Sequence, residues 1–267
     1  SEAIGMLIDV GTNAEVVVGN REWLIACAGA AGPALEGGVA KMGMRAGPGA
    51  IEHVTIDPDG RLSYRTIGGT GARGICGSGV IDLVAALYLG RLIDMRGKFR
   101  KNTDDGRIVE TAEGPAFVVA SAEETEDGNP VIFTQVDLDA VMRSKAAMYS
   151  ILTTLVNQVG LTFDEIETIF VAGAFGKHID PKQAITLGML PDLPLKKFVG
   201  IGNSSLQGAI RVLSDRKARQ GCLELVHKIT YIELNVNQEF MIRFSGSRFI
   251  PHTDHKLFPS VPFFNDF

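Results

Sequence analysis

The sequence is poor in cysteine, and its three cysteines, Cys27, Cys76 and Cys222, lie far apart. They form no Cys-x-x-Cys pair, so the 267 residues encode neither a disulfide framework nor a zinc or iron–sulfur site. This cysteine usage predicts a reduced, cytoplasmic setting.

Long apolar runs are also missing. The longest, residues 83–89 and 166–175, are interrupted well short of the roughly 20 residues that cross a bilayer, so no membrane span is predicted. The chain begins Ser1-Glu-Ala3 and runs directly into apolar residues, without the basic region and cleavage site of a signal peptide. We interpret this beginning as an engineered boundary within a longer protein.

A strong charge of either sign is absent as well. The net charge is -5, and both signs are spread along the chain, so there is no basic stripe to neutralise phosphates and nucleic acid is excluded as a partner. With 45% hydrophobic and 21% charged residues, the chain has enough apolar material for a folded core.

The first part of the chain has the pattern of short strands joined by tight turns. Turn residues and alternating apolar residues predict an antiparallel meander over 4–8, 14–18 and 23–27, and a second hairpin over 51–57 and 61–67 around Pro58-Asp-Gly60. A helix is predicted over 80–89, with Gly90 as its C-cap. The polar stretch from Lys98 to Asn129 is interpreted as an exposed insertion with little chemistry.

Strands and helices alternate in the second part, which predicts an α/β fold. A long amphipathic helix is expected from Asp137, as N-cap, to Val159. The remaining expected elements are strands at 166–172 and 198–201, helices at 181–187 and 204–213, a further strand after Ile229 and a short helix at 238–244. We treat residues 1–267 as one lobe, divided into 1–97, an insertion at 98–135, an α/β core at 136–228 and a tail at 229–267.

Two loops in this pattern have residues suited to nucleotide chemistry. In Leu7-Ile-Asp-Val-Gly-Thr-Asn13 a carboxylate ends a strand and precedes a tight turn, whose backbone N–H groups can point at a phosphate. About 160 residues later, Phe170-Val-Ala-Gly-Ala-Phe-Gly176 runs a strand into two glycines, which lets an adenosine lie against bare backbone. An ordinary hairpin turn and plain turn glycines are the alternatives.

Together these loops resemble the second phosphate loop and the adenosine loop of the actin, sugar-kinase and heat-shock chaperone superfamily. The likeness implies a ribonuclease-H-like or actin-like ATPase lobe, with helices packed on the faces of a mixed sheet. It also implies that Asp9 orients water or magnesium, that Gly11, Thr12 and Asn13 contact phosphate, and that Gly173, Ala174 and Gly176 line the base and ribose.

A closer resemblance covers most of the chain, in order. It is carried by six strings: Leu7-Ile-Asp-Val-Gly-Thr-Asn-Ala-Glu-Val-Val-Val-Gly-Asn20, Ala31-Gly-Pro-Ala-Leu-Glu-Gly37, Gly74-Ile-Cys-Gly-Ser-Gly-Val-Ile-Asp-Leu83, Val171-Ala-Gly-Ala-Phe-Gly176, Leu187-Gly-Met-Leu-Pro-Asp192 and Val199-Gly-Ile-Gly-Asn203. These look like the final domain of reductive activators of corrinoid proteins.

In that family, ATP-dependent activation returns an oxidised Co(II) corrinoid to Co(I). The resemblance implies ATP with Mg²⁺ as cofactor in the full-length protein, a [2Fe-2S] cluster in an upstream domain that this chain lacks, and a corrinoid protein as partner. It implies that this fragment is inactive alone, and a homodimer is possible.

Ala14 departs from the family pattern, where we expect glycine. A methyl group there would restrict positive φ and crowd the phosphate loop. Two rival functions therefore stay open. One is a small-molecule kinase lobe with Asp9 as general base, and the other is a non-enzymatic docking module whose nucleotide loops have decayed.

Other candidates have simpler explanations. Gly77, Ser78 and Gly79 open a helix and can offer N–H donors to an anion, but a plain N-cap by Ser78 explains them equally well. Glu36 is a candidate carboxylate that a solvated or capping role explains better, and Cys76 fits a buried packing thiol. The sequence His252-Thr-Asp-His255 carries two imidazoles without a regular element to aim them, so no metal site is assigned.

Overall fold

The computed structural model describes residues 2–30, 40–57, 59–100, 106–173 and 178–264. Within these residues the strands form three sheets. The largest has six strands in the order β11-β10-β1-β2-β3-β12. These strands are β1 (Gly5–Val10), β2 (Ala14–Gly19), β3 (Leu24–Gly29), β10 (Thr168–Ala172), β11 (Phe198–Gly202) and β12 (Ile229–Tyr231).

The six-stranded sheet is mixed. Its first three strands form the predicted antiparallel meander, β10 pairs parallel with β1, and β11 pairs parallel with β10. This is the strand order expected of a ribonuclease-H-like lobe, and the chain between β3 and β10 is inserted into it. The parallel pairing matters for function because it brings the carboxyl ends of β1, β10 and β11 to one edge of the sheet.

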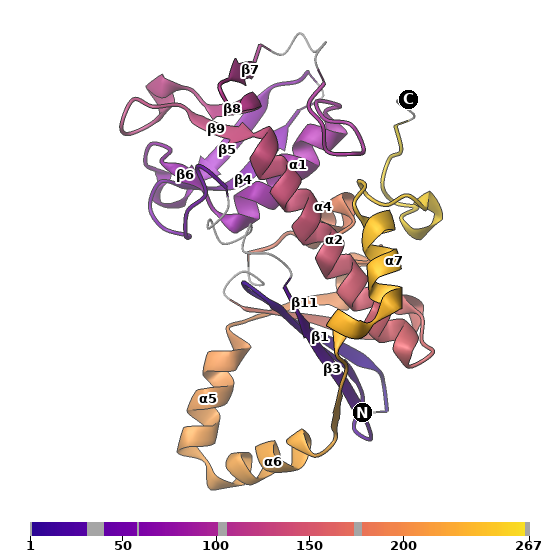
Figure 1. Cartoon of the computed structure of the whole chain (residues 1–267). Helices are drawn as coiled ribbons and strands as arrows, with labels where there is room; N and C mark the ends of the chain where they lie inside the picture. The colour runs from indigo at the N-terminus through magenta and orange to yellow at the C-terminus, as the bar shows by residue number, and fades with distance from the viewer. Residues whose placement is uncertain (1, 31–39, 58, 101–105, 174–177, 265–267) are drawn as a thin grey trace.

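The inserted part carries two three-stranded sheets, drawn above the six-stranded sheet in Figure 1. Their order is β5-β4-β6 and β7-β8-β9. The strands are β4 (Ala50–Ile56), β5 (Leu62–Thr66), β6 (Gly74–Ile75), β7 (Ile108–Thr111), β8 (Gly114–Ala120) and β9 (Val131–Thr134). Helix α1 (Gly77–Leu89) packs against β4 and ends at Gly90, as predicted.

The described residues within 98–135 do not form an exposed insertion. Their strands β8 and β9 contribute Phe117 and Phe133 to the hydrophobic core, and both side chains are almost completely buried. The polar turns on either side of these strands dominate the local composition and conceal two core strands. That part of the expected organisation is therefore wrong.

Helix α2 (Gln135–Gln158) runs from β9 to the six-stranded sheet, where it packs against β2 and β3 (Figure 1). Its N-cap is Thr134, whose hydroxyl accepts a hydrogen bond from the backbone N–H of Asp137. The Asp137 carboxylate in turn accepts from the Thr134 backbone N–H and hydroxyl. This reciprocal capping box starts the helix three residues earlier than predicted, with Asp137 inside the first turn.

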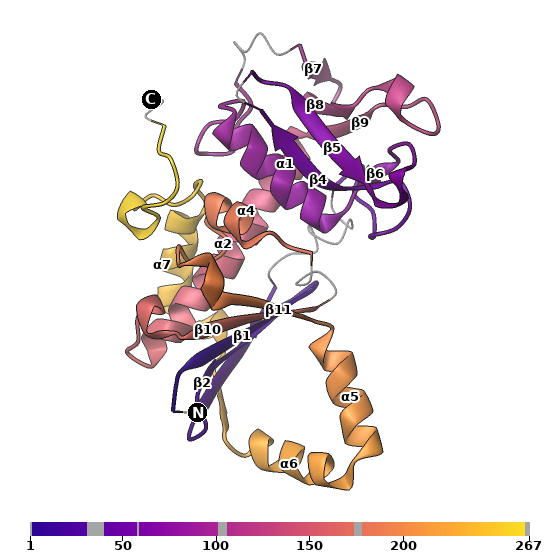
Figure 2. The ribbon, with the colours of Figure 1, turned by 180° about the vertical axis from the view of Figure 1, so that it is seen from behind.

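Four further helices follow in the second half of the described chain. They are α4 (Pro181–Leu187), α5 (Ser204–Ser214), α6 (Arg216–Val226) and α7 (Gln238–Ser247). Helix α4 packs against α1, and α7 packs against α2. By contrast, α5 and α6 stand away from the sheet (Figure 2). Among the described residues, no helix combines the length and apolar character needed to cross a membrane.

Candidate functional site

The two loops singled out in the sequence meet at one edge of the six-stranded sheet. Asp9, near the end of β1, pairs in register with Ala172, the last residue of β10. Gly173 follows at once with φ +93°, in the left-handed region that favours glycine. A Cβ on Gly173 would fall on the carbonyl of Val10 and 2.8 Å from Asp9 Oδ1. The absence of a side chain at Gly173 therefore keeps the space beside the Asp9 carboxylate open.

The β1–β2 turn, residues 11–13, is closed by a hydrogen bond that the Gly11 N–H donates to the Asn13 carbonyl over 2.8 Å. Thr12 and Asn13 are exposed at the tip of the turn. The Gly11 amide is thus engaged within the turn, and Thr12 and Asn13 are exposed residues at its tip.

Ala14 does not distort this turn. It is the first residue of β2, it pairs with Val10 and Gly29, and its methyl group is completely buried in the core. Among the described non-glycine residues, only Arg91 has a positive φ, so the backbone at Ala14 needs no glycine. The expectation that Ala14 crowds the phosphate loop is wrong, and the main feature favouring decayed nucleotide loops loses its force.

The first turn of α5 lies at the same sheet edge as Asp9. Its residues were not among the candidates selected from the sequence. Asn203 caps the helix by accepting from the Leu206 backbone N–H over 2.9 Å. Ser205 Oγ donates a hydrogen bond of 2.8 Å to Asp9 Oδ2. The unpaired N–H groups and dipole of a helix N-terminus favour negative charge. The sequence Gly202-Asn-Ser-Ser205 after a strand indicates the start of a helix. It does not indicate that Ser205 contacts Asp9.

Gly77, Ser78 and Gly79 are buried where α1 packs on β4. Ser78 Oγ donates to the Glu52 carbonyl over 3.0 Å, and a Cβ on Gly79 would overlap the Ile51 carbonyl. The N-cap of α1 is Cys76, so the expected capping role of Ser78 is wrong. The described contacts of this segment join it to β4 and not to the edge formed by Asp9 and Gly173, which favours a packing role.

Three of the candidate residues, Ala174, Gly176 and Glu36, fall outside the described residues. No group of three or more His, Cys, Asp or Glu residues suited to a metal ion occurs in the described ranges. His252 Nδ1 instead accepts a hydrogen bond of 2.9 Å from the Asp254 backbone N–H. Cys27, Cys76 and Cys222 are all free thiols, and the first two are buried.

A paired histidine and aspartate were not anticipated. His53 on β4 hydrogen bonds through Nδ1 to Asp82 on α1, and Asp82 is buried while the His53 side chain is 41% exposed. Burial raises the pKa of Asp82, although the imidazole and the Val54 N–H act in the opposite direction. Asp180, the N-cap of α4, adds to the rise. The two partners lie 29 residues apart without a motif, so sequence alone could not pair them.

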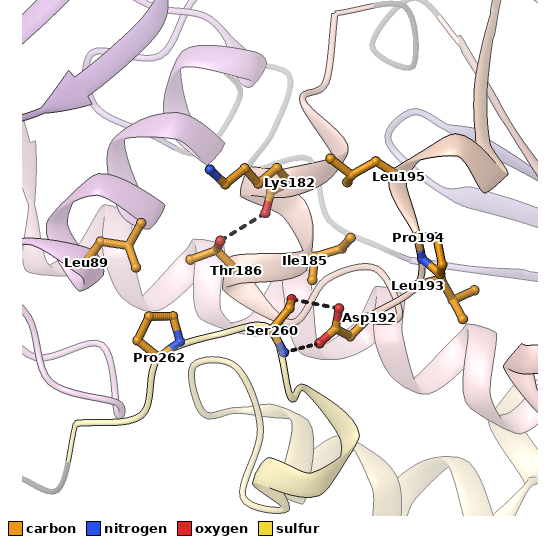
Figure 3. A pocket seen from close by; sticks show the side chains of 10 residues that line it. All are labelled: Leu89, Lys182, Ile185, Thr186, Asp192, Leu193, Pro194, Leu195, Ser260 and Pro262. Carbon is orange, nitrogen blue, oxygen red and sulfur yellow. Dashed lines mark hydrogen bonds between the residues drawn. The ribbon is translucent and has the colours of Figure 1, made fainter.

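A hollow of about 700 Å³ lies between α4, the end of α1 and the C-terminal segment (Figure 3). Asp192 accepts two hydrogen bonds of 2.7 Å from the backbone N–H and the hydroxyl of Ser260 at its rim. The other residues that line the hollow are mostly aliphatic, with Lys182 on one side. It includes neither Asp9 nor Gly173, and it holds no carboxylate or nucleophile left unpaired for catalysis.

The strand order, with the paired loops and the helix start at the same edge, defines one lobe of an actin-like fold. Residues 3–262 match the family model described as the C-terminal domain of RACo, the ASKHA domain. The chain belongs to this family.

Three relatives agree with this assignment. The chain is 36% identical over 243 residues to "Corrinoid activation enzyme RamQ" of Eubacterium limosum, covering 88% of this chain and 41% of the relative. It is 27% identical over 248 residues to "[Co(II) methylated amine-specific corrinoid protein] reductase" of Methanosarcina barkeri, covering 84% and 42%. A solved structure, "Reductive activator for corrinoid,iron-sulfur protein", superposes with a TM-score of 0.93 at 45% identity, covering 98% and 42%. The chain thus spans about two fifths of the length of these relatives.

Proposed function

We propose that this chain is the nucleotide-binding carboxy-terminal lobe of an ATP-dependent activator that reduces corrinoid proteins from Co(II) to Co(I). The observation that carries the proposal is the meeting of Asp9, Gly173 and the start of α5 at one sheet edge. The printed names of the relatives, which describe corrinoid activation and corrinoid-protein reduction, support the corrinoid protein as partner.

The residues at this edge fit ATP with Mg²⁺. Asp9 offers a carboxylate whose Oδ2 accepts from Ser205, with Oδ1 facing the space beside Gly173. Oxygen ligands and ordered water are what Mg²⁺ prefers. In our assignment Asp9 holds the metal or its water, Thr12 and Asn13 contact phosphate oxygens, and Gly173 leaves room for the nucleoside. When bound, ATP supplies a phosphoanhydride bond. Binding of ATP and cleavage of this bond can each favour one conformation of the full-length protein over another.

The electron comes from outside this chain. The three thiols lie on separate elements and do not fit a [2Fe-2S] cluster, which needs four convergent ligands. We assign the cluster to another domain of the full-length protein, where its one-electron oxidation balances the reduction of Co(II) to Co(I). A nucleotide can favour the reducible complex only through different affinities for two states, so the lobe acts by coupling nucleotide binding to docking.

Calorimetry with ATP and ADP tests the nucleotide part in a protein that contains both lobes. We expect saturable binding, and we expect Asp9→Ala to slow ATP hydrolysis by about 100-fold or more because the carboxylate acts on charge that develops in the transition state. The same variant should fold normally, since Asp9 is only half-buried at the sheet edge. Absence of binding at millimolar nucleotide would leave the docking module as the explanation.

Two further measurements separate the remaining alternatives. Appearance of the Co(I) absorption spectrum in a corrinoid protein should require both ATP and a reduced electron donor. ATP consumption that depends on a small hydroxyl compound, without any change at cobalt, would instead establish a kinase. A reduced, cytoplasmic setting agrees with the free thiols and remains a prediction.

A further inference from the structure

The hollow of about 700 Å³ shown in Figure 3 has no part in the proposed nucleotide chemistry. We call it the groove. Three stretches of the chain line it: the end of α1, helix α4 with the segment 192–195 that follows it, and the C-terminal segment at 260–262. Its volume lies in the range of roughly 300–1,000 Å³ that is typical of cavities that bury a compact ligand.

The groove has a buried apolar floor and a more exposed apolar rim. On the floor, Ile185 and Leu193 are 4% and 6% exposed. On the rim, Leu89 and Leu195 are 39% and 51% exposed. Apolar side chains that stand singly on a surface are ordinary, whereas these four border one concave space. Concave apolar positions of this kind receive the anchoring side chains that dominate the affinity of protein interfaces.

The wall that the C-terminal segment contributes is held in place. The Tyr88 hydroxyl donates a hydrogen bond of 3.0 Å to the Pro262 carbonyl. The Arg91 guanidinium lies 4.5 Å from the centre of the Phe264 ring, within the range of a cation–π interaction. A partner that enters the groove therefore meets a preformed surface, which lowers the entropic cost of docking.

Two lysines stand against one carboxylate at the groove. Asp192 is the single carboxylate among the described lining residues, and both of its oxygens accept hydrogen bonds from Ser260. Lys182 Nζ, by contrast, has no ion-pair or hydrogen-bond partner in the described part of the chain. Lys196, next to Leu195 in the chain, is exposed as well. The complementary surface of a partner is an apolar side chain with carboxylates beside it.

Much of the groove wall belongs to the connection between β10 and β11. Helix α4 and the segment 192–195 both lie in this connection. Strand β10 runs into Gly173 beside Asp9, and β11 leads into α5, whose Ser205 hydrogen bonds to Asp9. The groove itself does not include the nucleotide edge, but its wall is joined in the chain to both elements that border the Asp9 carboxylate.

We propose that the groove is the docking surface for the corrinoid protein, which inserts an apolar side chain flanked by carboxylates. This inference rests on the proposed function and adds to it the surface at which docking occurs. The corrinoid protein is the partner because the names of the relatives describe action on corrinoid proteins, and because the groove wall is joined to the nucleotide edge. The connection between β10 and β11 gives nucleotide binding a route to the docking surface, which the coupling in the proposed function requires.

A binding measurement with a protein that contains both lobes tests the docking surface. The probe is the Co(II) form of the corrinoid protein in which the unaltered activator produces the Co(I) spectrum. Leu195→Glu should raise the dissociation constant by about 30-fold or more, because it places a charge in the apolar contact and opposes the carboxylates of the partner. Val136→Glu is the matched control, since Val136 on α2 is 57% exposed but lies outside the groove, and it should leave the affinity unchanged.

Substitutions of Lys182 test the charge at the rim. Lys182→Met should lower the association rate with the same corrinoid protein by about 5-fold at low salt, and it should flatten the dependence of this rate on salt. Lys182→Arg keeps the positive charge and should keep both the rate and its salt dependence. Equal association rates for Lys182→Met and Lys182→Arg at low salt would contradict a partner surface with carboxylates.

The outcomes separate this inference from the proposed function. If the unaltered protein binds ATP and the corrinoid protein, and Leu195→Glu binds the corrinoid protein as tightly as Val136→Glu, the groove is not the docking surface although the proposed function stands. If Leu195→Glu instead lowers the free energy of unfolding in urea and leaves the affinity for the corrinoid protein intact, another domain of the activator covers the groove, which also overturns the inference. If the unaltered protein neither binds nor reduces a corrinoid protein, the proposed function fails, and the inference fails with it.

Discussion

Ser205 Oγ lies 2.8 Å from Asp9 Oδ2, and this hydrogen bond joins residues 196 positions apart in the chain. It connects the end of β1, where we place nucleotide chemistry, with the first turn of α5.

Ser205→Ala tests the importance of this contact. Removing the hydroxyl leaves Asp9 without its side-chain donor, so the carboxylate is less well oriented. In a protein with both lobes we expect ATP hydrolysis to slow by about 10-fold, as for the loss of a hydrogen bond to a charged group. Nucleotide affinity, measured by calorimetry, should change much less than the steady-state rate.

Ser204→Ala is the matched control for that experiment, because Ser204 occupies the same helical turn and has no hydrogen bond to Asp9. Equal rates in the two variants would show that the Ser205–Asp9 contact is incidental to hydrolysis. Loss of binding in Ser205→Ala alone would point to a role in holding the nucleotide instead.

Gly173→Ala should destabilise the protein and block the site. Its φ of +93° is unfavourable for alanine, and the new Cβ would meet the Val10 carbonyl and the Asp9 carboxylate. We expect the free energy of unfolding in urea to fall by about 2–3 kcal/mol, from strain and overlap together. Gly202→Ala separates the two causes, since its φ is +67° but a Cβ there meets nothing within 4 Å. A similar loss in both variants would mean that the contact with Asp9 is easily relieved.

The strands that carry the loops could be predicted because local pattern determines them. Alternating apolar residues in β1 and β2, and the apolar run ending at Gly173, indicate buried strands whatever surrounds them. The meeting of Asp9 with Gly173 follows once β1 and β10 are parallel neighbours. The contact between Ser205 and Asp9 depends on how α5 is positioned relative to β1 in the folded chain. No local sequence pattern encodes that position.

The incorrect predictions arose where local sequence does not reveal the tertiary environment. Phe117 and Phe133 are core residues between highly polar turns, so their segment was assigned as exposed from its average polarity. Ala14 was interpreted through a glycine in related sequences, whereas its own backbone is that of an ordinary strand. The expected elements did not include α6, although Asp215 offers an N-cap directly before it.

Lys145 ties the C-terminal segment to α2. Its side chain is buried, and Nζ donates to the carbonyls of Phe249 and Pro251 over 2.5 and 2.6 Å. Lys145→Met keeps the apolar volume but leaves both carbonyls without their donor, so we expect a loss of about 2–4 kcal/mol in the free energy of unfolding. Chemical denaturation followed by circular dichroism measures it.

Lys197→Met provides the comparison. Lys197 Nζ also donates to two carbonyls, those of Asp164 and Ile166, but it lies nearer the surface, where water can replace it. We expect a loss of less than about 1 kcal/mol there. Equal losses would mean that burial does not govern the contribution of Lys145.

His252 should make the protein less stable in mild acid. Burial, helped by the nearby positive charge of Lys145, lowers the pKa of this imidazole from 6.5 to about 4. Its Nδ1 accepts from the Asp254 N–H, and its ring stacks near Phe258, so protonation would break the hydrogen bond and bury a charge.

The sign follows from proton binding. Between pH 6.5 and pH 4 the unfolded chain binds the proton and the folded protein does not, so acid favours unfolding over this window. Partial exposure of the ring reduces the effect, and we expect the free energy of unfolding to drop by about 1–2 kcal/mol from pH 7 to pH 5 through this residue.

His252→Asn retains an acceptor for the Asp254 N–H but does not titrate, so the pH dependence of its free energy of unfolding should be shallower by that amount. If the slope persists in His252→Asn, another group is responsible for the acid sensitivity.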